Sequence, residues 1–230
     1  MVDFLLNFPN KYIKIIQRVN LWIIFLGCVN MLDYSYENNA HNEGYLVVCG
    51  VDEAGRGPLA GPVFAGAVIL PENYTHEILN DSKKLSEKKR DLVYDDIIRD
   101  AISWSVGIAT EQEIDDINIL NATFLAMKRA VNGLNIKPDL AFIDGNRYAN
   151  TGVKEITIVK GDSKCMSVAA ASIIAKVSRD RFMQEVDKQY PQYQFSKHKG
   201  YGTKLHYEMI EQYGISPVHR KTFLKNIIGK

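Results

Sequence analysis

Residues 45–70 form the stretch YLVVCGVDEAGRGPLAGPVFAGAVIL, from which the fold can be worked out. It holds two short apolar runs, at 45–52 and 61–70, separated by a bend rich in glycine and proline. Runs of this length that contain several valines are typical of buried strands. Because the connection is short, we expect the two strands to run in opposite directions.

The rest of the chain alternates strands with helices. We expect helices at 86–101, 111–134, 163–190 and around 203–213, and further strands at 102–110, 140–143 and 156–159. The order of these elements predicts an α/β fold with a sheet of mixed strand direction, layered with helices. The small residues at 169–172 of the long helix predict close packing on that sheet.

Composition excludes several classes of protein. With 230 residues, 46% hydrophobic and 24% charged, the chain suits one large domain or a domain with an appendage, and neither disorder nor a fibrous structure. The net charge is +1, but residues 160–230 hold 13 Lys and Arg against 6 Asp and Glu, whereas residues 1–159 hold 15 against 21. An acidic N-terminal part and a basic C-terminal part suit a protein that holds metal ions with one part and a polyanion with the other. The alternative is a chance distribution of surface charge.

The cysteines indicate a reducing compartment. Cys28, Cys49 and Cys165 are odd in number and widely spaced, which argues against a disulfide framework and against structural zinc. We therefore expect a cytoplasmic protein.

Residues 1–44 differ from the rest, and we interpret them as an N-terminal extension outside the native fold. The apolar run 21–28 (LWIIFLGC) is too short to span a bilayer, which needs ~20 apolar residues. Basic residues precede it as in a signal peptide, but no convincing cleavage site follows. The alternatives are an amphipathic appendage or sequence upstream of the true start, with Met31 as a natural initiator.

Two adjacent carboxylates stand at the end of the first predicted strand. Asp52 and Glu53 run straight into Gly55-Arg56-Gly57. Buried strands avoid charge, so this pair needs a reason. Successive strand residues face opposite sides, so both can serve one site only if the strand ends or bulges there. The alternative is a turn with two solvated acids.

Further acids stand at other element ends. Asp144 follows the strand 140–143, and Asp162 stands between a strand and the long helix, where it could instead cap that helix. Asp180 lies ~27 Å further along the helix, so it cannot share a metal centre with Asp162. We expect Asp180 to pair with Arg179 or Arg181 on the surface. Clustered carboxylates without cysteine or histidine favour Mg²⁺ or Mn²⁺, and two such ions would activate water and polarise a phosphodiester.

The C-terminal part interleaves basic, glycine and tyrosine residues, notably at 197–204 (KHKGYGTK). This pattern suits a nucleic-acid backbone. We expect His198, His206 and His219 to be phosphate-binding or structural residues, because their spacing does not suit zinc. Residues 81–85 (DSKKL) offer hydroxyl and ammonium groups to phosphate. The alternative in both places is a solvated charged loop.

Residues 50–63 (GVDEAGRGPLAGPV) closely resemble the opening motif of the bacterial ribonuclease HII family. Further motifs of that family recur in order: 81–86 (DSKKLS), 144–146 (DGN), 160–163 (KGDS) before an alanine-rich helix, 198–203 (HKGYGT) and 219–223 (HRKTF). The resemblance covers residues 45–226. No matched motif departs from the family pattern, and only residues 1–44 are longer than its usual lead-in.

The resemblance implies a ribonuclease H-like fold, with a five-stranded mixed sheet, flanking helices and a C-terminal helical segment. The catalytic domain would span 45–190, and the basic segment 191–230 would complete the substrate-binding surface. The implied catalytic and metal-binding residues are Asp52, Glu53, Asp144 and Asp162. The implied substrate-binding residues are Gly55, Arg56, Gly57, Tyr201, Ser82 and Lys83, of which the glycine-rich loop and Tyr201 would recognise the ribose 2′-OH.

The activity implied is hydrolysis of RNA in RNA/DNA hybrids and incision of duplex DNA 5′ of an embedded ribonucleotide. It would need Mg²⁺ or Mn²⁺ and leave 3′-OH and 5′-phosphate ends. We expect a monomer that does not bind membranes. Two alternatives stay open: a nuclease of the same fold that cuts DNA without ribose, and a hybrid-binding protein without catalysis.

Overall fold

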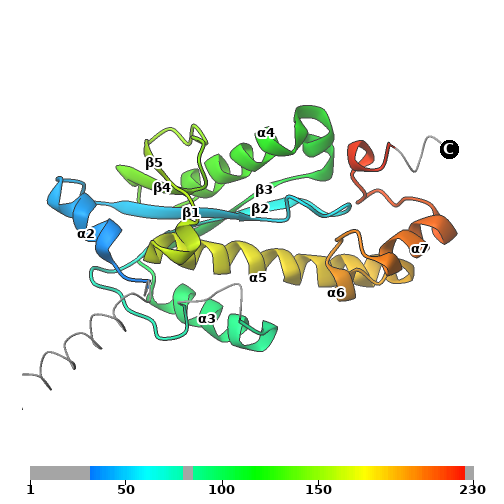
Figure 1. Ribbon diagram of the computed structural model, residues 1–230, viewed down its shortest axis with the longest axis horizontal. Helices are drawn as coiled ribbons and strands as arrows, with labels where there is room; N and C mark the ends of the chain where they lie inside the picture. The colour runs from blue at the N-terminus through cyan, green and yellow to red at the C-terminus, as the bar shows by residue number, and fades with distance from the viewer. Residues whose placement is uncertain (1–31, 80–84, 226–230) are drawn as a thin grey trace, which may run out of the picture. The chain divides into compact units, whose positions relative to one another are not determined.

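The computed structural model describes residues 32–79 and 85–225. At its centre is a five-stranded sheet with the strand order β3-β2-β1-β4-β5 (Figure 1). The strands are β1 (Val48–Ala54), β2 (Val63–Ile69), β3 (Ser103–Ala109), β4 (Leu140–Asp144) and β5 (Lys154–Ile158). The first three pair antiparallel, whereas β4 is parallel to both β1 and β5. The predicted mixed sheet is confirmed.

Helices cover both faces of this sheet, as Figure 1 shows. α4 (Glu111–Asn132) lies on one face, and α5 (Met166–Gln189) on the other, with α3 (Glu87–Asp100) beside it. α2 (Ser35–Asn42) precedes the sheet, and α6 (Phe195–His198) and α7 (Lys204–Tyr213) follow α5. The connecting 3-10 turns are η2 (Gly161–Ser163), η3 (Pro191–Tyr193) and η4 (Lys221–Phe223).

Capping residues explain where the helices begin. Ser86 and Thr203 accept hydrogen bonds from backbone N–H groups in the first turns of α3 and α7, and Thr110 forms a capping box at the start of α4. The predicted helix 111–134 is interrupted at Asn118, whose φ of 67° and ψ of 164° are not helical. The side chain of Asn118 accepts two backbone N–H groups of the following turn and so caps the second part of α4.

Alternating strand residues build two cores. Cys49 and Val51 of β1 pack with α4, whereas Gly50 and Asp52 face α5. The same alternation in β2 sends Ala65 and its odd-numbered neighbours into the α4 core. This period of two residues is the reason why adjacent residues of β1 end on opposite faces of the sheet.

Helix α5 lies unusually close to β1 and β2. A Cβ atom built at Gly50 would lie 2.1 Å from the backbone of Ser167, and one at Gly66 would lie 2.4 Å from the carbonyl oxygen of Ala171. The predicted close packing of this small-residue segment is therefore confirmed. It depends on glycine in the strands as much as on alanine in the helix.

Residues 32–44 belong to the folded unit, contrary to the expectation that the fold begins at residue 45. Leu32 and Tyr34 are buried in the core that lies between the sheet, α3 and α5, and Ala40 packs with Phe142 and Val168. The described residues from 32 to 225 form one compact unit without a division at residue 190. The apolar run 21–28 lies outside the described residues. Among those residues, no helix is long and apolar enough to cross a membrane.

The C-terminal segment contributes three buried histidines to the folded unit. His198, His206 and His219 are buried, with 3.0 Å between the Nε2 atoms of His206 and His219. The rings of His198 and His206 stack with their centroids 4.4 Å apart. The structural role expected for these histidines is thus confirmed, and a phosphate-binding role is excluded by their burial.

Glycine at position 66 is expected to be essential for the stability of the fold. Gly66→Ala places a methyl group against the α5 backbone, so the helix must move, and we expect the free energy of unfolding to fall by about 1–3 kcal/mol. Urea denaturation followed by circular dichroism measures this change. An unchanged midpoint would contradict the close approach of α5 to β2.

Acid is expected to weaken the histidine cluster. Burial, together with the neighbouring imidazoles, lowers the pKa of His206 and of His219 to about 4. In the unfolded chain both titrate near ~6.5, so the unfolded state binds more protons between these two values. The free energy of unfolding therefore falls as the pH drops through this range, by on the order of 1–3 kcal/mol per imidazole. Urea denaturation at neutral and mildly acid pH tests this, and His206→Gln should reduce the slope.

Candidate active site

Strand β1 carries the first two carboxylates within regular pairing. Asp52 lies opposite Gly66 and Glu53 opposite Ala65 of β2, and the strand continues to Ala54. The strand therefore neither ends nor bulges at Asp52, although this was the condition under which both side chains were expected to serve one site. The reason is that hydrogen bonding to β2 keeps β1 extended through Ala54. On the other side of β1, strand β4 ends at Asp144.

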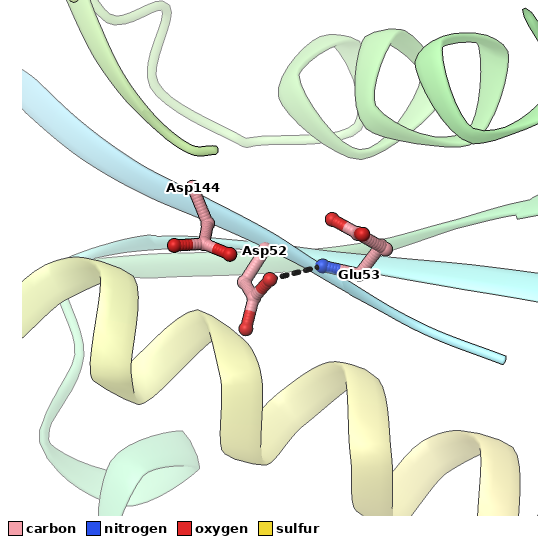
Figure 2. Close-up of side chains that lie close together, drawn as sticks. All are labelled: Asp52, Glu53 and Asp144. Atoms are coloured by element: carbon pink, nitrogen blue, oxygen red, sulfur yellow. Dashed lines mark hydrogen bonds between the residues drawn. The ribbon is translucent and has the colours of Figure 1, made fainter. Parts of the chain in front are cut away.

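The end of β4 opens the site. The parallel register pairs Val51 with Ile143, so that Asp144, the last residue of β4, lies beside Asp52. Beyond this point β1 has no β4 partner on that edge. The long Glu53 side chain can therefore approach the two aspartates although it starts on the other face of β1 (Figure 2).

Three carboxylates converge at this edge. One oxygen each from Asp52, Glu53 and Asp144 lies within 4.8 Å of the others. Figure 2 shows Asp52 directed toward α5, with Asp144 beside it and Glu53 on the opposite side of β1. Backbone N–H groups hold two of them: Glu53 N donates to Asp52 Oδ1 at 2.7 Å, and Gly161 N donates to Asp144 Oδ1 at 2.7 Å.

Burial and mutual repulsion oppose the charged forms of these groups. Burial raises the pKa of Asp52 well above its ordinary value, and the carboxylates of Glu53 and Asp144 raise it further, against a hydrogen bond from Ser172. Burial also raises the pKa of Glu53, although Arg56, 3.2 Å from its Oε1, acts in the opposite direction. Such a cluster of converging hard oxygen donors fits a divalent cation.

The carboxylates lie between two hollows. On the α5 side, a pocket of about 370 Å³ is lined by Asp52, Glu53, Asp144, Gly55, Arg90, Ser172, Lys176 and Tyr201, among others. On the α4 side, a pocket of about 260 Å³ is lined by Glu53, Asp144, Arg56, Phe124, Asn146 and Arg147, among others. Both hollows carry basic side chains, which suits a polyanion passing over the carboxylates.

The predicted glycine-rich loop reaches the same pocket. Gly55 has a φ of +97°, and a Cβ atom there would lie 2.1 Å from Nε of Arg179, so only glycine fits. A Cβ atom at Gly57 would lie 3.8 Å from the ring of Tyr201. The structure thus brings Gly55, Gly57 and Tyr201 together with the carboxylates, although Tyr201 is some 150 residues away in sequence.

Two buried arginines hold the backbone of this loop through hydrogen bonds to its carbonyl oxygens. Arg220 donates to the carbonyl oxygens of Gly55, Arg56 and Gly61 at 2.6, 2.9 and 2.8 Å. Arg179 donates to carbonyl oxygens of Ala60, Pro62 and Lys199 at 3.0–3.1 Å. The loop and the C-terminal segment are therefore held by the same pair of guanidinium groups.

Asp162 is close to the cluster but not among the converging oxygens. It lies in η2, is 6% exposed, and follows Gly161, which hydrogen-bonds Asp144. Its role as a fourth ligand stays a prediction. The N-cap of α5 is Cys165 rather than Asp162 or Ser163. Ser82 and Lys83 lie outside the described residues.

The expected pairing of Asp180 is wrong. Asp180 is buried and contacts Lys176 at 2.7 Å and Arg90 at 3.8 Å, rather than Arg179 or Arg181. One helical turn separates it from Lys176, and this turns both residues toward the same side of α5. Asp180 therefore holds two basic residues that line the α5-side pocket.

The sequence reasoning missed several residues of the site. Lys176 is a single charge in an otherwise apolar stretch of the long helix, and this signal could have identified it. Arg220 lies in the motif 219–223, which did not reveal its role, and Ser172 and Arg179 have no local signal. Their roles depend on partners more than 100 residues away.

Comparisons with known proteins identify the family of the chain. The family model described as Ribonuclease HII matches residues 49–226. Ribonuclease HII of Caldicellulosiruptor bescii is 52% identical over 196 residues, which cover 85% of this chain and 95% of the relative. Ribonuclease HII of Acetivibrio thermocellus is 55% identical over 193 residues, or 84% of this chain and 75% of the relative.

Solved structures agree as well. The crystal structure of the ribonuclease H2 from Pyrococcus horikoshii OT3 superimposes with a TM-score of 0.66 at 30% identity, over 77% of this chain and 93% of that one. The predicted ribonuclease H-like fold is thereby confirmed. The protein is a ribonuclease H-type enzyme, and the chain belongs to the ribonuclease HII family.

Proposed function

We propose that this enzyme, beyond degrading RNA in RNA/DNA hybrids as a ribonuclease HII, incises duplex DNA on the 5′ side of a single embedded ribonucleotide, leaving 3′-OH and 5′-phosphate ends. One observation carries the proposal. The glycine-rich loop and Tyr201 share a pocket with the three carboxylates. The groups proposed to recognise ribose and the groups proposed to cut the phosphodiester therefore line one pocket.

The carboxylates would hold the divalent cations. Asp52, Glu53 and Asp144 offer converging hard oxygens in a site whose burial disfavours uncompensated charge, and Mg²⁺ or Mn²⁺ would relieve that repulsion. Asp162 is proposed as a further ligand because it follows Gly161 directly. When bound, such cations polarise the phosphodiester, lower the pKa of water and stabilise the leaving oxygen.

The chain itself keeps the carboxylates in place. The N–H groups of Glu53 and Gly161 fix Asp52 and Asp144, and Ser172 holds Asp52 from α5. Oxygens held by backbone groups need little reorganisation when substrate binds. This pre-organisation supports an in-line hydrolysis at one phosphodiester.

Ribose recognition is proposed to use the backbone of the loop. Arg220 holds the carbonyl oxygens of Gly55 and Arg56 inward. Because C=O and N–H point in opposite directions in a trans peptide, the N–H groups of Arg56 and Gly57 point away from Arg220. They are then able to contact the 2′-OH, which is the group that distinguishes RNA from DNA, while Tyr201 packs against the sugar.

The basic surface that would bind the duplex is proposed to be smaller than the 13 Lys and Arg of residues 160–230 indicate. Lys197, Lys204 and Lys221 are exposed in the C-terminal segment, whereas Arg179 and Arg220 are buried and bonded to carbonyl groups. Ser82 and Lys83 remain proposed phosphate contacts. Because every group of the site comes from one chain, we propose a monomer. The buried free thiols of Cys49 and Cys165 support a reducing, cytoplasmic setting.

A labelled DNA duplex with one ribonucleotide, incubated with Mg²⁺ or Mn²⁺ beside an all-DNA duplex, tests the proposal. The expected result is a single metal-dependent cut 5′ of the ribose and none in the control. Cutting of both duplexes would overturn ribose recognition and favour a DNA nuclease of the same fold. Binding without cutting would overturn the catalytic assignment.

Asp144 is expected to be required for catalysis but not for binding. Asp144→Asn removes one of the three converging charges, and we expect cleavage to fall by more than ~100-fold, because even partners outside the metal ligands change activity by 10–100-fold. Single-turnover cleavage and fluorescence anisotropy measure the two effects separately. Asp96→Asn, which alters a carboxylate paired with Arg99 on α3, is the matched control and should keep full activity. Turnover by Asp144→Asn at the parent rate would disprove the assignment.

Tyr201 is expected to contribute to the choice of substrate. Stacking of a base on an aromatic ring is worth about 1–3 kcal/mol. With this as the scale for packing of the ring against a sugar, Tyr201→Ala should lower kcat/KM at the single ribonucleotide by ~5-fold or more, and by no more than ~150-fold. Tyr201→Phe keeps the ring and separates the contribution of the hydroxyl group. If Tyr201→Ala cuts the single-ribonucleotide duplex as well as the parent does, Tyr201 has no role in recognition.

A further inference from the structure

Glu37 of α2 is a buried acidic residue that lies outside both pockets of the carboxylate site. It has no part in the proposed chemistry. Its side chain is 1% exposed. Its Oε1 accepts three hydrogen bonds, from Ser167 N at 2.7 Å, Ser167 Oγ at 2.7 Å and Cys165 Sγ at 3.1 Å. Within the described residues, its Oε2 is buried without a hydrogen-bond partner. A buried carboxylate with an unsatisfied oxygen costs free energy, so its placement calls for a physical reason.

The start of α5 supplies that reason. Its N-cap residue, Cys165, makes no side-chain capping bond, and its first turn holds no acidic residue. Helix N-termini carry unpaired N–H groups and a partial positive charge, which a carboxylate satisfies. Glu37 therefore caps α5 from a different helix, 130 residues earlier in the chain. An isolated backbone β-bridge between Asp33 and Cys165 holds the two segments together next to this cap.

The capped turn is directly connected to the carboxylate cluster. The N–H of Cys165 donates to the carbonyl oxygen of Gly161 at 2.9 Å, and the N–H of Gly161 donates to Asp144 at 2.7 Å. Asp162 lies in the same short turn, η2. The backbone of Ser167 also contacts β1 at Gly50, two residues before Asp52. The capped start of α5 is thus in contact with the backbone segments that position Asp144, Asp162 and Asp52.

We propose that Glu37 is a positioning residue for the cation site of this enzyme. By holding Cys165 and Ser167, it fixes the η2 turn, which in turn sets the direction of the Asp144 carboxylate and the place of Asp162. This inference rests on the proposed cation-dependent function. It assigns a role in the site to residues 32–44.

The predicted effect is on cation binding and turnover rather than on substrate binding. Groups that orient metal ligands typically change metal affinity or activity by 10–100-fold when they are removed. Glu37→Ala should therefore weaken Mn²⁺ binding, measured by calorimetry on the protein without nucleic acid, by ~10-fold or more. It should lower kcat with little change in KM for a hybrid duplex, since the loop and Tyr201 are untouched.

Two further variants separate positioning from general stability. Glu37→Gln keeps an acceptor oxygen and the shape of the side chain, so it should restore part of the Mn²⁺ affinity. Ala40→Gly weakens α2 and its packing without removing the cap, and it should lower the unfolding midpoint while leaving Mn²⁺ affinity unchanged. If Glu37→Ala does not fold, Ser167→Ala, which removes only the hydroxyl donor to Oε1, should still weaken Mn²⁺ binding relative to Ala40→Gly.

The outcomes distinguish this inference from the proposed function. A parent protein that neither binds Mn²⁺ nor cuts would refute both. A parent that cuts, together with a Glu37→Ala variant that binds Mn²⁺ like the parent, would refute the positioning role alone. Loss of Mn²⁺ affinity in proportion to lost stability, in Ala40→Gly as in Glu37→Ala, would also refute it.

Discussion

At Gly50 and Gly66 the backbone of α5 lies so close to the sheet that no side chain fits between them. The site depends on this contact. It brings Ser172 to Asp52, places Lys176 in the pocket, and carries Arg179 beneath the glycine-rich loop. A larger residue at either strand position would displace the helix and all of these groups with it, because protein interiors are close-packed and shift as units.

Two buried arginine side chains, which are unusual in a protein interior, connect the C-terminal segment to α5 and to the glycine-rich loop. Arg179 and Arg220 are fully buried, and burial lowers the pKa of each guanidinium group. Each donates to three backbone carbonyl oxygens, which compensates the loss of water. These bonds connect the loop at 55–62 to α5 and to the C-terminal segment. Arg220 of the basic C-terminal segment is thus an internal support, whereas Lys197, Lys204 and Lys221 of the same segment are exposed.

Much of the site was predictable because its parts follow local rules. Acids after apolar strands are rare enough to stand out, and Asp52, Glu53 and Asp144 do converge. The geometry by which they converge was not predictable. Local sequence indicated a strand that ends at Asp52, whereas β1 runs on and β4 ends instead. Likewise, Asp180 pairs with Lys176 and Arg90, because partners on other elements compete with sequence neighbours.

From the sequence alone follow the order of strands and helices and the residue types of a carboxylate site beside a glycine-rich loop. Periodicity, capping and turn chemistry act over a few residues, so they can be read directly. Tertiary packing alone explains why residues 32–44 belong to the fold, why Glu37 caps α5, and why Arg220 supports the loop. Those contacts join residues more than 100 positions apart, and their energy comes from burial that exists only once the sheet and helices have packed.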